Sequence, residues 1–239
     1  MSNPHFSPDG TKIAFTVSVP DRETNGYLSD LYLYDLGKKT VSRVTCSGDA
    51  KTWSWTAENT LIFTAARTAA LKKEKENGTS FLYEISPSGG EAQCITSIPA
   101  TVTGIRLLPD GRYLLTIRHD NYRDTRKKSY EVFDELPFWG NGQGYTNAKR
   151  NRYAIYDMGS GKLTYVADEW TDCSQYSVLG NLLLYKAYPV ETECHGNPSG
   201  ALSLLPLHRR DKNLDRAGFH AHRSCLPLRR KDCTHCGNG

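Results

Sequence analysis

A turn followed by a short apolar segment recurs four times in this chain, and no other feature constrains the fold as strongly. The copies begin at Phe6, Trp55, Leu107 and Ser177. The first copy contains Ser-Pro-Asp-Gly, in which Pro presets φ at the first central turn position and Gly accepts a positive φ later in the turn. The apolar segment after each turn is short and continuous, which favours a strand that is buried on both faces.

A second element comes after each of the first three turns and reads as a strand, a Gly-containing hairpin and another strand. Its copies span residues 30–45, 80–96 and 152–167. The two elements together supply four short strands, which is the content of one blade of a β-propeller. Coincidental hairpins in an unrelated β domain are the alternative.

The spacing of the turns supports the propeller. Asp9 and Glu58 are 49 residues apart, Glu58 and Asp110 are 52 apart, and Asp110 and Gly180 are 70 apart. An insertion rich in charged and aromatic residues, from about residue 118 to about residue 150, accounts for the longer last interval. We therefore predict an all-β fold: an incomplete β-propeller of about three and a half four-stranded blades over residues 1–200.

The charge of the chain is concentrated at its C-terminal end. The formal net charge of the 239 residues is +4, but residues 208–239 contain eight Lys or Arg against three Asp. Residues 201–239 show no strand alternation or helical period, so we expect an irregular, basic, Cys- and His-rich tail there. Nucleic-acid binding would depend on this tail alone, and it is not predicted for residues 1–200.

Three further observations bear on the class of protein. No apolar run approaches the roughly 18 residues of a membrane span, so no membrane interaction is predicted. The N-terminus lacks the basic and then apolar plan of a signal peptide, which indicates a cytoplasmic protein. The seven Cys are then expected to be free thiols.

Two stretches resemble a known family. Residues 3–17 (Asn-Pro-His-Phe-Ser-Pro-Asp-Gly and the strand after it) resemble the first blade of the prolyl oligopeptidase family of serine peptidases, in its acylaminoacyl-peptidase branch. Residues 131–145, with Leu-Pro-Phe-Trp-Gly, and the subsequent residues 152–163 resemble the same family. The turn and strand alone also resemble the WD-like repeats of TolB-type propellers. The resemblance covers about residues 3–200.

The resemblance implies a role in substrate selection. In this family the propeller caps an α/β-hydrolase domain and passes short peptides while holding back folded proteins. The catalytic Ser, Asp and His belong to the hydrolase domain, and this sequence contains no Gly-x-Ser-x-Gly nucleophile elbow. Ser160, between two glycines, reads as a hairpin tip. No catalytic residue, cofactor-binding residue or cofactor is therefore predicted.

The chain is accordingly expected to be the propeller fragment of such a peptidase, without the catalytic domain and inactive by itself. The resemblance implies peptides as partners, which the missing catalytic domain would bind. It is also compatible with a homo-oligomer. The alternative function is that of a stand-alone, TolB-like propeller used for protein interaction. A catalytic domain encoded in frame after the propeller would favour the peptidase, and a stop codon after the last blade would favour the alternative.

The tail admits two interpretations. A shifted reading frame near residues 201–205 would explain its change of character, because permitted codons from Leu205 onward, read one nucleotide later, yield another turn-and-strand sequence. The other interpretation is a zinc site, since two Cys at Cys-x-x-Cys spacing are preceded by further ligand types. Its candidate ligands are Cys225, Cys233, Cys236 and His220.

Other aromatic and charged residues have structural interpretations. Trp53 and Trp55 lie on one face of a predicted strand, and at least one of them is expected to pack between blades, with ligand stacking as the alternative. Residues 118–128 mix basic, aromatic and acidic side chains, and residues 72–76 precede Asn-Gly; both are expected to be exposed loops. By analogy with the family, Trp139 and Tyr145 could contribute to gating.

Overall fold

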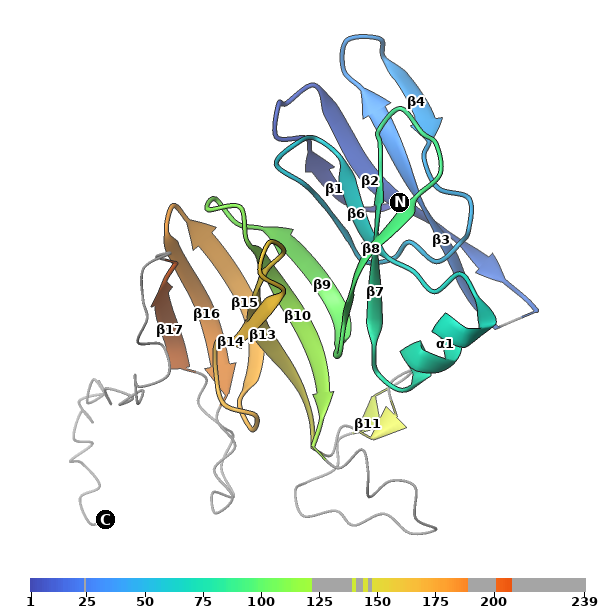
Figure 1. Ribbon diagram of the computed structural model, residues 1–239. Helices are drawn as coiled ribbons and strands as arrows, with labels where there is room; N and C mark the ends of the chain where they lie inside the picture. The colour runs from blue at the N-terminus through green and yellow to red at the C-terminus, as the bar shows by residue number, and fades with distance from the viewer. Residues whose placement is uncertain (24, 122–138, 141–143, 146–147, 189–200, 208–239) are drawn as a thin grey trace, which may run out of the picture. The chain divides into compact units, whose positions relative to one another are not determined.

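The structure is a computed structural model that describes residues 1–23, 25–121, 139–140, 144–145, 148–188 and 201–207. Met1–Leu207 form one compact unit. Within the described residues, four antiparallel sheets of three or four strands succeed one another along the chain, and a single helix accompanies the second (Figure 1). The predicted partial propeller of four-stranded, meandering blades is thereby confirmed.

The first sheet has its strands in chain order, β1-β2-β3-β4. They are β1 (Ser2–Phe6), β2 (Lys12–Asp21), β3 (Gly26–Asp35) and β4 (Thr40–Arg43). The predicted turn and strand correspond to the β1–β2 hairpin and β2, and the predicted second element corresponds to β3 and β4.

The second sheet repeats this order as β5-β6-β7-β8. Its strands are β5 (Trp53–Trp55), β6 (Leu61–Thr64), β7 (Ser80–Ile85) and β8 (Gln93–Ile98). Helix α1 (Ala69–Glu76) connects β6 to β7.

Helix α1 corrects the sequence-based expectation of a loop at residues 72–76. Oγ1 of Thr68 caps the helix by accepting a hydrogen bond from the backbone N–H of Leu71 at 3.2 Å. The residues between this cap and Asn77 are Ala, Leu, Lys and Glu, all of which favour helix. None of them is buried, so local propensity and the cap produce the helix without an apolar stripe that a sequence pattern could reveal.

The third sheet has the order β14-β13-β10-β9, in which the insertion separates β10 from β13. Its strands are β9 (Thr101–Leu107), β10 (Tyr113–Asp120), β13 (Lys149–Asp157) and β14 (Lys162–Tyr165). Within the insertion, β11 (Trp139–Gly140) and β12 (Gly144–Tyr145) pair with each other.

The fourth sheet contains three described strands in the order β15-β16-β17. They are β15 (Asp172–Leu179), β16 (Leu182–Tyr188) and β17 (Ala201–Pro206). The compact unit thus extends to Leu207, past the boundary at residue 200 drawn from the sequence. Strand β17 has no signal in the sequence because its Leu-rich residues lack alternation, whereas the structure buries Leu205 and Leu207 against the third sheet. Residues of the tail beyond Leu207 lie outside the described part.

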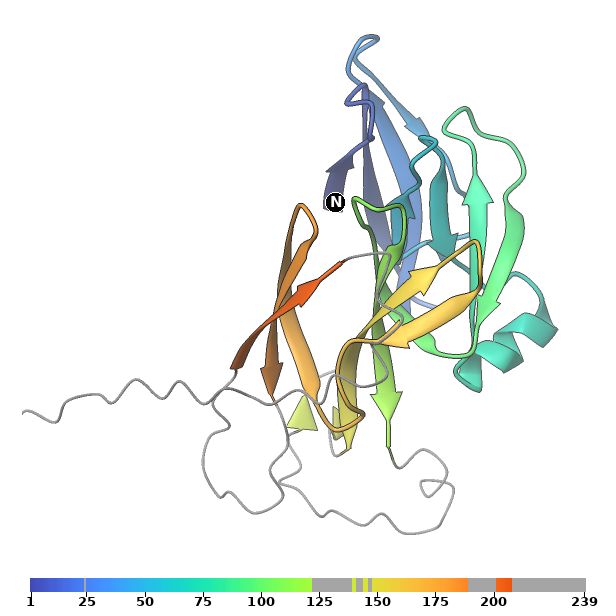
Figure 2. The same ribbon diagram turned by 60° about the vertical axis from the view of Figure 1, so that its left-hand side comes forward.

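Side chains along a strand alternate between the two faces of its sheet. The second and third sheets can therefore each pack against both of their neighbouring sheets. In β6, Leu61 and Phe63 belong to a core shared with the first sheet, while Ile62 belongs to a core shared with the third. In β10, Leu115 faces the second sheet and Leu114 faces the fourth. Figure 2 shows the sheets turned to face one another in this succession. Burial of each such side chain contributes roughly 1.5–3 kcal/mol, which explains why these strands read as continuous apolar runs.

The turns before β2, β6 and β10 share one geometry. Gly10, Asn59 and Gly111 occupy equivalent positions with φ of 71°, 61° and 86°. Each donates its backbone N–H to the carbonyl three residues earlier. The positive φ is the reason for Gly or Asn at these positions, and it confirms the turn chemistry expected from the repeat.

Candidate functional site

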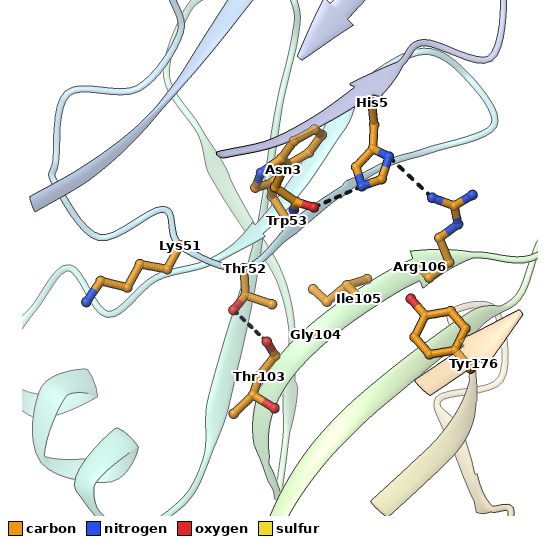
Figure 3. Close-up of a pocket in the computed structure, with 10 residues that line it drawn as sticks. All are labelled: Asn3, His5, Lys51, Thr52, Trp53, Thr103, Gly104, Ile105, Arg106 and Tyr176. Atoms are coloured by element: carbon orange, nitrogen blue, oxygen red, sulfur yellow. Dashed lines mark hydrogen bonds between the residues drawn. The ribbon is translucent and has the colours of Figure 1, made fainter. Parts of the chain in front are cut away.

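The first strands of all four sheets approach one pocket of about 330 Å³, which we call the axial pocket (Figure 3). Its lining residues are Asn3 and His5 of β1, Lys51 and Thr52 before β5, Trp53 of β5, Thr103, Gly104, Ile105 and Arg106 of β9, and Tyr176 of β15. In β-propellers the blades surround a central channel. The axial pocket therefore has the position at which a propeller presents residues to a molecule that enters its channel.

His5 is the centre of a polar chain across the pocket. Its Nε2 lies 3.0 Å from Oδ1 of Asn3, and its Nδ1 lies 3.3 Å from Nη1 of Arg106. A guanidinium can only donate, and a carbonyl oxygen can only accept. The network therefore assigns the proton of a neutral imidazole to Nε2, with Nδ1 accepting from Arg106.

The surroundings of His5 favour its neutral form. Partial burial lowers the pKa of His5 below its usual 6.5, and the nearby charge of Arg106 lowers it further. The ring also packs edge-on against Trp53, with ring centres 5.7 Å apart. His5 thus acts as a neutral acceptor that orients Arg106.

Trp53 and Trp55 both pack against the first sheet, where packing of at least one was predicted. Trp53 is 2% exposed and Trp55 is 4% exposed. Nε1 of Trp53 donates to Oγ1 of Thr16 at 2.8 Å, and Nε1 of Trp55 donates to the carbonyl of His5 at 3.2 Å. These bonds fix β5 against β2 and β1, so both indoles are structural, and Trp53 also lines the pocket.

Close packing shapes the floor of the pocket along β9. A Cβ built on Gly104 would lie 2.9 Å from Oγ1 of Thr116 and 3.1 Å from its Cβ. Beside it, Oγ1 of Thr52 donates to the carbonyl of Thr103 at 3.3 Å, which links the start of β5 to β9. Gly104 is thus required because β10 approaches the strand too closely for a side chain.

Three of the four first strands are irregular at the pocket. The register of β1 shifts between Ser2 and His5, that of β15 shifts between Ser174 and Tyr176, and that of β9 shifts next to Thr103. Asn3 and Gln175 have φ of 56° and 47° at two of these places. Bulges re-aim side chains and occur often beside functional sites.

Tyr176 completes the pocket on the side of the fourth sheet. Its ring packs edge-on against Tyr153 at 5.4 Å between ring centres. Burial raises the pKa of Tyr176, and the charge of Arg106 opposes this effect. At neutral pH the phenol therefore remains protonated and offers both a donor and an acceptor.

Sequence reasoning does not identify the axial residues as a set. His5 belongs to a family-like stretch, but no motif singles out Arg106 or Tyr176. The available signal is positional, because each lies in the strand that precedes a repeated turn. Residues 122–138, which include part of the expected exposed loop, lie outside the described residues, as do the candidate zinc ligands Cys225, Cys233, Cys236 and His220. For Trp139 and Tyr145 the structure gives backbone pairing only.

A metal centre and a membrane-spanning helix were sought among the residues that the structure describes. There, the structure holds no group of three or more His, Cys, Asp or Glu side chains that could bind a metal ion. Over the same residues, no helix is long and apolar enough to cross a membrane.

Comparison by sequence relates the chain to one curated peptidase. It is 26% identical over 212 residues to the "Uncharacterized peptidase YuxL" of Bacillus subtilis (strain 168), an alignment that covers 83% of this chain and 31% of that protein. No family model matches the chain.

Comparison by structure finds the same fold in known peptidases. The acylaminoacyl peptidase of Pyrococcus horikoshii matches with a TM-score of 0.59 and 12% identity over 85% of this chain and 30% of that one. A puromycin-hydrolyzing peptidase of Mycobacterium tuberculosis matches with a TM-score of 0.52 and 14% identity over 86% of this chain and 27% of that one. The chain therefore spans less than a third of the length of each of these proteins. The resemblance inferred from the sequence is confirmed: this chain is similar to the β-propeller region of peptidases of the acylaminoacyl peptidase kind.

Proposed function

We propose that this propeller admits extended peptides to the catalytic domain of a serine peptidase and holds back folded proteins. The observation that carries the proposal is the axial pocket, which is lined by the first strands of all four sheets. The similarity to peptidase propeller regions supplies the reaction, hydrolysis of peptides or acylated peptides, that such a filter would serve.

The size of the pocket suits an extended chain. Its volume of about 330 Å³ lies at the small end of the range for ligand pockets, roughly 300–1,000 Å³. An extended strand needs only the roughly 4.8 Å spacing of neighbouring strands. A folded domain of about 100 residues has a radius of gyration of about 13 Å. A pocket of this volume therefore has room for a segment of extended chain and not for a folded domain.

The lining also suits a peptide chemically. Peptide groups need both donors and acceptors, and the pocket offers the amide of Asn3 and the hydroxyl of Tyr176. The hydroxyls of Thr52 and Thr103 donate to backbone carbonyls, and their oxygens can still accept. Such contacts recognise the backbone that all peptides share. The lining is therefore suited to admission of many sequences rather than selection of one.

Photo-crosslinking tests this proposal. A short peptide that carries a benzophenone side chain is irradiated with the 239-residue chain, in parallel with a stably folded protein that displays the same segment in a loop. We expect the peptide to crosslink to β1, β9 and β15 and the folded protein to leave these strands unlabelled. Equal labelling by the folded protein, or peptide labelling confined to β4, β8 and β14, would contradict the proposal.

A further inference from the structure

The lining of the axial pocket carries positive charge without an opposing carboxylate. Lys51 and Arg106 are its basic residues, and none of its ten lining residues is Asp or Glu. In the described part of the chain neither residue forms an ion pair, unlike Arg43, which pairs with Asp30, and Arg112, which pairs with Asp110. Both side chains are exposed, and a cleft lined by one charge sign attracts the opposite charge.

The guanidinium of Arg106 is held in place with most of its donors available. Its one described hydrogen bond goes from Nη1 to Nδ1 of His5. A guanidinium has five N–H donors in a planar fork that matches a carboxylate. Because His5 is itself held by Asn3 and packed on Trp53, the loss of side-chain entropy on binding is partly avoided.

Strand β9 offers backbone groups beside Arg106. It is an edge strand, since only β10 pairs with it. The N–H of Leu107 points away from β10 and donates to Oγ of Ser54 at 3.2 Å. The register is regular from Leu107 to Ile105, so alternation in an antiparallel ladder directs the N–H and C=O of Ile105 away from β10 as well. The bonds of Leu107 to Ser54 and of Thr103 to Thr52 lie on either side of Ile105, so this edge offers a peptide the backbone groups of Ile105 alone.

We propose that the axial pocket recognises a carboxylate of the peptide, which Arg106 binds while Ile105 pairs with the peptide backbone. This inference rests on the proposed function, because it specifies the peptides that the propeller admits. The carboxylate can belong to the C-terminus or to an Asp or Glu side chain, and the two sources need separate probes.

Calorimetric titration of the 239-residue chain with three peptides tests the inference. The probes are a short neutral peptide with a free C-terminus, the same peptide as its C-terminal amide, and an amidated form that contains one Asp. We expect the free acid to bind about tenfold or more tightly than the neutral amide, as hydrogen bonds to charged groups predict. Affinity of the Asp-containing amide close to that of the free acid would assign side-chain carboxylates to the site too, and affinity close to that of the neutral amide would restrict it to the C-terminus.

Substitutions test whether Arg106 causes the difference in affinity between the free acid and the amide. Arg106→Gln should weaken binding of the free acid about tenfold to a hundredfold, and Arg106→Lys should retain part of the affinity because it keeps the charge. The matched control is Arg22→Gln, which removes one charge from an exposed residue that does not line the pocket, and it should bind as the original chain does. Circular dichroism confirms that each variant is folded.

The outcomes separate this inference from the proposed function. Equal affinity for free acid and amide, unchanged in Arg106→Gln, would overturn the carboxylate site and leave peptide binding intact. Binding of no peptide by the folded original chain would overturn both.

Discussion

Nη1 of Arg106 donates a hydrogen bond to Nδ1 of His5 over 3.3 Å, and this bond joins the first strand of the third sheet to that of the first sheet. The two residues are 101 positions apart in the chain. Their contact makes the axial pocket a product of the relative placement of whole sheets. Small changes at either residue should therefore be measurable in stability as well as in binding.

The pH dependence of stability should report on His5. Partial burial, and after it the charge of Arg106, lowers the pKa of His5 in the folded state below 6.5. Protonation then favours the unfolded chain, so the contribution of His5 is present above about pH 6.5 and is lost as pH falls through the folded pKa. Urea midpoints measured over this range should fall less in His5→Gln than in the original chain. Parallel pH profiles for the two proteins would contradict this account.

The hydrogen bond between Trp53 and Thr16 should stabilise the packing of the first two sheets. Trp53→Phe leaves the hydroxyl of Thr16, a residue that is 3% exposed, without its partner at Nε1 and removes indole volume, so we expect a loss of about 2–4 kcal/mol. Thr16→Val removes the other partner. In a double-mutant cycle measured by urea unfolding, the two losses should add to more than the loss in the double variant. Strict additivity would show that the bond contributes nothing.

A methyl group at Gly104 should distort the pocket floor. Gly104→Ala places a Cβ 2.9 Å from Oγ1 of Thr116, and such overpacking costs about 1–3 kcal/mol. Thr116→Ala in the same chain removes the nearest atom and should recover part of the loss. Gly37→Ala is the control, because its Cβ would meet only Oδ1 of Asp35 at 3.5 Å. Equal thermal midpoints for Gly104→Ala and Gly37→Ala would argue against the close approach of β10.

The outward face of the fourth sheet should promote self-association. Leu179 is 79% exposed, Leu182 46% and Leu204 60%, while Leu183 is buried. Strand pairing brings Leu179 opposite Leu182, so apolar side chains gather on one face, and such patches favour association. Replacing Leu182 and Leu204 by Glu should lower the apparent mass in concentrated solution and leave the unfolding midpoint nearly unchanged. Light scattering after size exclusion measures this, and an unchanged mass would exclude this face as the cause.

Most of the fold is predictable because the turns of the repeat have a local signal in the sequence. The Gly or Asn at Gly10, Asn59 and Gly111 is required by a positive φ, and this requirement is local. The apolar runs after the turns are continuous because a sheet between two neighbours buries both faces of its strands. Helix α1 escapes prediction because none of its residues is buried, so it has no apolar stripe. Strand β17 escapes prediction because Leu205 and Leu207 are buried by contacts with other sheets rather than by a local pattern.

The candidate site is less predictable for a physical reason. Arg106 and His5 are ordinary residues in strands of ordinary composition, and only the packing of three successive sheets brings their side chains together. Bulges at Asn3 and beside Thr103 re-aim the strands in ways that strict alternation does not foresee. A sequence that indicates where the strands are thus leaves open which of them meet.

The central claim, that peptides bind on the first strands of the sheets, is tested most directly by the crystal structure of the chain with a short free-acid peptide bound. We predict an extended peptide along β9 with its carboxylate at the guanidinium of Arg106. A peptide seated on the outer strands β4, β8 or β14, with the axial pocket empty, would contradict the claim.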